Sequence, residues 1–145
     1  MCRASRPTAT RATCQTRCFV ALRRDQKLTL AYALGRTAFG VALLAAPSQV
    51  GSSWLGADAD RAPVHVAIRG LGARDIALAG GAAWAAVKHD SPRPWLVGTV
   101  AGDVTDIAAT LAAGSSIPAR ARWGTLGLAG ASALAGAALA AAADS

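Results

Sequence analysis

The chain has 145 residues, of which 53% are hydrophobic and 16% are charged, and it carries a formal net charge of +7. This length suits one domain, and an apolar fraction this high favours a membrane protein over a water-soluble one. The sequence has no Glu and only two Lys residues, so the Glu–Lys pairs that cover a soluble, alanine-rich four-helix bundle cannot form, which argues against that rival fold.

Residues 1–27 differ in kind from the rest of the chain. Seven Arg and Lys residues stand there among Ser, Thr, Ala and Cys, with Asp25 as the only acidic residue. This composition predicts a disordered basic arm or a transit-like extension. We expect anionic lipid headgroups to bind it. Nucleic acid is not expected as a partner, because Phe19 is the only aromatic residue of the arm.

All three cysteines lie in this arm. They are Cys2, Cys14 and Cys18. The spacing of the last two is wider than that of a redox C-x-x-C motif, and both histidines lie far away in the sequence. We therefore predict no metal and no cofactor.

Four apolar segments of about 19 to 24 residues follow the arm, each long enough to cross a membrane as a helix. They cover 28–46, 64–87, 95–114 and 123–143. The predicted fold is all-α: a four-helix transmembrane bundle formed by residues 28–145, after the disordered arm. The positive-inside rule places both termini of this multi-pass cell-membrane protein in the cytoplasm and residues 48–63 in an outer loop.

Charged residues near the middle of the first three segments form the candidate site. Such residues cost roughly 2.5–3.5 kcal/mol each at the bilayer centre, so they persist only where they face partners or a wet cavity. The predicted intramembrane charge network consists of Arg36, Arg69, Arg74, Asp75, Asp103 and Asp106, with His65, Thr99 and Thr110 as supporting polar groups.

In the first segment, Gly35 and Gly40 flank Arg36 and let another helix approach it. The second segment carries too much charge to insert alone. Either neighbouring helices surround it, or it is partly unwound at Gly70 and Gly72. We favour the plainer interpretation, in which these two glycines serve as close-packing sites.

The third segment places its polar groups at steps of three and four residues, on one inward helical face. They are Trp95, Thr99, Gly102, Asp103, Asp106 and Thr110. The two carboxylates either handle a cation or proton, or only neutralise arginines. Counting residues from the ends of the segments places Arg36 at the depth of Asp103 in the membrane and Asp106 further toward Arg69, so we predict the pairs Arg36 with Asp103 and Arg69 with Asp106. We expect poor pairing between the adjacent Arg74 and Asp75.

The fourth segment carries rows of small residues, the pattern by which membrane helices pack. They are Gly124, Gly127, Ala131, Ser132, Ala135 and Gly136. We expect this helix to have a purely structural role.

The combined motifs are Gly35-Arg36, the loop from Pro47 to Trp54, the run from Arg69 to Asp75, Asp103-x-x-Asp106 with Thr110, and the small-residue last helix. Over residues 28–143 they resemble a family of small, uncharacterised four-helix integral membrane proteins common in actinobacteria. The architecture is also loosely similar to proteins of the DoxX type. The resemblance implies a four-helix transmembrane bundle and no particular activity.

Two functions remain open from the sequence. The leading hypothesis is a structural or assembly bundle held by its Arg/Asp network, with the lipid bilayer, a second copy or another membrane protein as partner. The alternative is a carrier, channel or ligand-binding protein that handles a small solute or proton at Asp103 and Asp106. An enzyme is disfavoured, because the sequence has no recognisable nucleophile, nucleotide or metalloprotease motif.

Overall fold

The computed structural model describes residues 22–143, and this part of the chain is all-helical, without strands. In chain order it contains α1 (Arg24–Ala45), α2 (Pro47–Leu55), the 3-10 helix η1 (Gly56–Asp60), α3 (Ala62–Lys88), α4 (Arg93–Ala113), η2 (Gly114–Ser116) and α5 (Ala119–Ala142). The predicted all-α class is confirmed. Most of the predicted arm, with its three cysteines, lies outside the described residues.

Helix α1 begins at Arg24, four residues before its predicted start at 28. Gln26 explains the difference. Its Oε1 accepts a hydrogen bond of 2.9 Å from the backbone N–H of Arg23, which caps the helix, and its Nε2 donates to the carbonyl of Ala86 at 3.1 Å. The last residues of the predicted arm therefore belong to the helix, because a buried polar side chain fixes them to α3.

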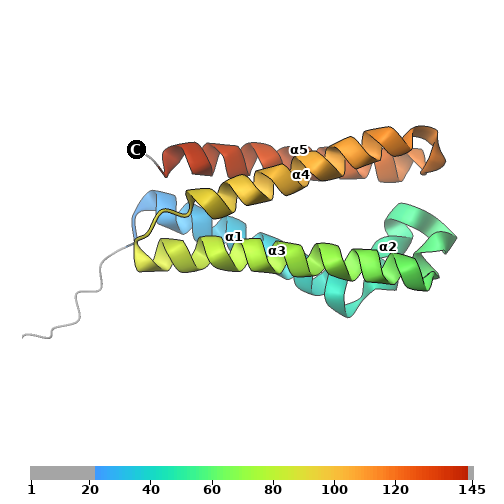
Figure 1. The fold of residues 1–145 in the computed structure, drawn as a ribbon, viewed down its shortest axis with the longest axis horizontal. Coiled ribbons are helices and arrows are strands. Elements are labelled where there is room, and N and C mark those ends of the chain that lie inside the picture. Colours follow the sequence, from blue (N-terminus) through green and yellow to red (C-terminus); the bar gives the residue numbers. More distant parts are fainter. Residues whose placement is uncertain (1–21, 144–145) are drawn as a thin grey trace, which may run out of the picture.

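The long helices form two pairs (Figure 1). Helix α1 packs along α3, and α4 packs along α5. The two pairs lie close together near the turn between α3 and α4, and they diverge toward the opposite end, where α2 lies. At the turn, His89 ends α3 in a left-handed conformation with φ 60°, which reverses the chain within a few residues. At the diverging end, α2 contacts α5.

The predicted outer loop at 48–63 is itself largely helical. Pro47 occupies the first turn of α2, where its missing N–H costs nothing. Gly56 ends α2 with φ 60°, a backbone conformation that favours glycine. The short helices α2 and η1 then return the chain to α3.

Large apolar side chains lie mainly on the outside of the bundle. Leu34, Val66 and Leu134 are each more than 70% exposed, whereas most buried apolar residues are alanines. Three charged residues, Arg36, Asp75 and Asp103, and three threonines, Thr29, Thr99 and Thr110, are buried instead. This distribution is the reverse of that in a soluble bundle and is compatible with a membrane protein, whose lipid-facing surface is apolar and whose helices pack through small residues.

In the described part of the chain, three helical stretches are long and apolar enough to cross a membrane: Arg24–Ala45, Arg93–Ser116 and Ala119–Ala142. They contain most of the first, third and fourth predicted spans. Helix α3, which contains the second, is not among them because charged residues interrupt its apolar sequence. It is nevertheless one continuous helix, so the alternative of an unwound segment at Gly70 and Gly72 is wrong. The favoured prediction of close packing is confirmed at Gly72 and wrong at Gly70, where nothing lies within 4 Å of the Cβ position.

Candidate functional site

Arg36 is the centre of the buried charge cluster. Its Nη1 donates to Oδ2 and Oδ1 of Asp103 at 2.8 and 3.0 Å, and its Nη2 donates to Oδ1 of Asp75 at 2.8 Å. All three side chains are less than 10% exposed. One guanidinium thereby connects α1, α3 and α4, and the predicted pair of Arg36 with Asp103 is confirmed.

Helix α5 also reaches this cluster, through Ser132. The Ser132 Oγ accepts a hydrogen bond of 2.6 Å from Nη1 of Arg36. The Tyr32 hydroxyl lies 3.1 Å from the same Oγ and donates to the Ser132 carbonyl at 3.2 Å. Ser132 was predicted only as a small packing residue of a purely structural helix, and no role was predicted for Tyr32, so the polar contacts of both residues are new. The available signals were a hydroxyl in the middle of the last apolar segment and a tyrosine one turn before Arg36.

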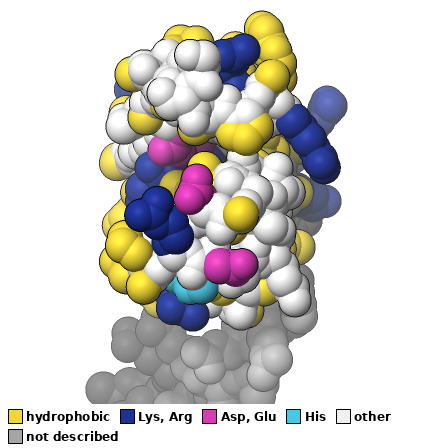
Figure 2. All heavy atoms as spheres, turned by 90° about the vertical axis from the view of Figure 1, so that its right-hand side faces the viewer, with side chains coloured by type: hydrophobic (Ala, Val, Ile, Leu, Met, Phe, Trp, Pro, Cys, Tyr) yellow, Lys and Arg dark blue, Asp and Glu magenta, His cyan; other side chains and the backbone are white. Residues whose placement is uncertain are grey.

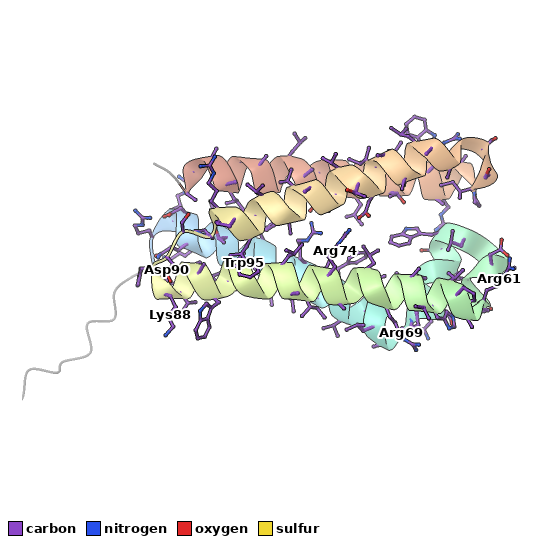
Figure 3. All side chains as sticks on the ribbon, in the orientation of Figure 1. Arg61, Arg69, Arg74, Lys88, Asp90 and Trp95 are labelled. Atoms are coloured by element: carbon purple, nitrogen blue, oxygen red, sulfur yellow. The ribbon has the colours of Figure 1, made fainter. Side chains whose placement is uncertain are left out.

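A second ion pair lies beside the first. Nη2 of Arg74 donates to Oδ2 of Asp106 at 2.8 Å and lies 3.5 Å from Oδ1 of Asp75. Figure 3 shows Arg74 extending from α3 into the space beside α4. Gly102 makes room for it, because a Cβ there would lie 3.1 Å from Cζ of Arg74. We use the term charge network for the five connected residues Arg36, Arg74, Asp75, Asp103 and Asp106.

Arg69 is outside the charge network, and its predicted pairing with Asp106 is wrong. It is exposed, and its Nε lies 3.5 Å from the carbonyl of Leu44. Figure 3 shows it on the other side of α3 from Arg74. Asp106 is only about 4.5 Å along α4 from Asp103. The long Arg74 side chain, which starts next to Asp75, reaches Asp106 across this distance. Depth along the helix therefore did not show which arginine pairs with Asp106.

The three supporting polar residues do not join the charge network. Nε2 of His65 lies 2.9 Å from Oγ of Ser48, which connects α3 to α2. The hydroxyls of Thr99 and Thr110 donate to carbonyls of their own helix, Thr110 to Asp106 at 2.7 Å. Both threonines are buried, so the predicted inward face of α4 is confirmed at these positions, while their hydroxyls serve the local backbone.

A cleft of about 610 Å³ lies beside the charge network. Its walls come from α1, α2, α3, α4 and α5, and most of the lining side chains are apolar or aromatic. Figure 2 looks onto the end of the molecule where α2 and the turn between α4 and α5 lie, and shows acidic and basic side chains close together among hydrophobic ones. The charged residues that line the cleft are Arg36, Asp75, Asp103 and Asp106.

Hydrogen bonding in the charge network is incomplete for donor atoms and for acceptor atoms. The Nε atoms of Arg36 and Arg74 are sealed from solvent and have no hydrogen-bond partner among the described residues. Oδ2 of Asp75 likewise accepts no hydrogen bond from residues 22–143, although its Oδ1 has two arginine neighbours. Three carboxylates face two guanidinium groups, so the charge network has a net charge of −1 when all its members are ionised.

Comparison with known proteins gives no relative: no family model, no curated protein and no solved structure matches this chain.

Proposed function

We propose that this chain is a small integral membrane protein that binds a small solute in the cleft beside the charge network. The observation that carries the proposal is the cleft of about 610 Å³ with Arg36, Asp75 and Asp103 in its wall. Polar groups gathered at one side of a largely apolar cavity are typical of ligand sites. A network that only held helices together would be expected to be packed over by side chains, as protein interiors are.

The proposal counts α3 as a membrane span in addition to the three apolar helical stretches, which gives four spans. Its central charged residues pair with residues of the neighbouring helices: Asp75 pairs with Arg36 of α1, and Arg74 pairs with Asp106 of α4. Such pairing supports insertion of a helix that is too charged to insert alone. Four spans and a basic N-terminal arm place both termini in the cytoplasm, and the four-helix membrane bundle is also what the family resemblance implies.

Access of water to the cleft tests the proposed function. In a background with Cys2, Cys14 and Cys18 replaced by Ser, a single cysteine is introduced by Gly35→Cys, and Gly80→Cys serves as the matched control. Nothing lies within 4 Å of the Cβ position at either glycine, but only Gly35 lines the cleft. In nanodiscs we expect a charged, membrane-impermeant thiol reagent to modify the Gly35→Cys protein and to spare the control. Equal lack of reaction would leave the charge network with a structural role only.

A further inference from the structure

We propose that the solute is an organic ammonium ion, with an apolar or aromatic body that fills the cleft and an N–H group that donates to Asp75. This inference rests on the proposed solute-binding function and names its ligand class. Three observations carry it: the charge balance, an open acceptor atom and a pair of aromatic rings.

The charge balance favours a cation. The cleft is lined by three carboxylates and one guanidinium, and Arg74, which pairs with Asp106, adds the second positive charge. When all five residues of the charge network are ionised, the surplus of one negative charge stands in a largely apolar surrounding, where an unbalanced charge is costly. A bound monocation neutralises the site, whereas an anion would double the surplus.

The free hydrogen-bonding atoms favour a donor. Oδ2 of Asp75 has no partner among the described residues, in a side chain that is only 4% exposed and lines the cleft. Nε of Arg36, the unpartnered donor nearby, is sealed from solvent, so a ligand in the cleft does not reach it. The open position therefore accepts a hydrogen bond, and an ammonium N–H supplies one with charge assistance.

Two aromatic rings complete the site. Phe39, which follows Arg36 by three residues in α1, and Trp54 of α2 both line the cleft. Their ring centroids are 6.1 Å apart, and the ring planes are tilted by 57°. Aromatic rings in a site that also holds carboxylates suit an organic ammonium ion, because the ring quadrupole attracts the cation and the ring surface packs on its apolar body.

Three probes with one ring system and different charges test this class. They are 1-naphthylmethylammonium, the neutral 1-naphthalenemethanol and the anionic 1-naphthylacetate. Binding to the full chain in nanodiscs is measured by titration calorimetry, and the signal of empty nanodiscs is subtracted to remove partitioning into lipid. We expect saturable binding of the ammonium ion, at least tenfold tighter than that of the alcohol, and no measurable binding of the carboxylate.

Variants that keep the charge network intact locate the binding. Gly35→Leu places a side chain in the cleft and should abolish binding of the ammonium probe, while Gly80→Leu, outside the cleft, should leave it unchanged. Phe39→Leu should weaken binding several-fold without unfolding the protein. Equal affinity for the alcohol and the ammonium ion, or tighter binding of the carboxylate, would overturn the ammonium assignment and leave a solute-binding cleft. No binding of any probe to a protein whose Gly35→Cys variant reacts with the thiol reagent would overturn it as well.

Discussion

Gly40 of α1 and Gly72 of α3 pack backbone against backbone. A Cβ added to Gly40 would lie 2.7 Å from the carbonyl oxygen of Gly72, and one added to Gly72 would lie 2.6 Å from that of Gly40. The contact is one helical turn from the ion pair, since Gly40 follows Arg36 by four residues and Gly72 precedes Asp75 by three. Close approach of the two backbones brings the guanidinium within reach of the carboxylate.

The first prediction follows from this contact. Gly72→Ala should destabilise the protein by roughly 1–3 kcal/mol, because the methyl group forces two helices apart. Gly70→Ala is the matched control in the same helix: nothing lies within 4 Å of its Cβ position, so it should be neutral or stabilising. The thermal midpoint of both variants in detergent measures the difference, and equal midpoints would contradict the contact.

The second prediction concerns the two partners of Arg36. Asp103→Asn should cost about 3–5 kcal/mol, because it removes one counter-charge from a buried group. Arg36→Gln should cost more, since it leaves Asp75 and Asp103 without their shared partner. The double variant should be more stable than the sum of the two losses implies. A double-mutant cycle of unfolding free energies checks this, and strictly additive losses would show that the pair is not coupled.

The third prediction separates the two other arginines of α3. Arg74→Gln should destabilise the protein by about 1 kcal/mol or more, because Asp106 loses its partner in a half-buried pair. Arg69→Gln serves as the control and should change stability by less than about 0.5 kcal/mol, as expected for an exposed residue outside the charge network. A larger loss of stability for Arg69→Gln than for Arg74→Gln would instead support the pair of Arg69 with Asp106.

The fourth prediction concerns topology. Ser52 in α2 and Asp90 in the turn between α3 and α4 are both exposed, and four spans would place them on opposite sides of the membrane. In intact cells, with the native cysteines replaced by Ser, an impermeant thiol reagent should label Ser52→Cys and spare Asp90→Cys. Labelling of the latter alone would invert the proposed orientation, and labelling of both would rule out the four-span arrangement.

Much of the fold could be predicted from the sequence because the helices are long and apolar. The inward face of α4 followed from residues at steps of three and four, and Thr99, Asp103 and Thr110 are buried, although Trp95 at the start of this face is exposed. The pair of Arg36 with Asp103 followed from equal depth in two helices. Both conclusions need only the regular geometry of an α-helix, which the local sequence sets.

The arrangement of the helices around one another was decided by tertiary structure alone. Helical periodicity does not say which neighbour a long arginine side chain meets, so the choice of Arg74 over Arg69 for Asp106 depended on the space left by Gly102. The contribution of Ser132 depended on how α5 turns toward Arg36. The cleft itself is lined by residues of five helices, so it depends on interhelical angles that no single segment encodes.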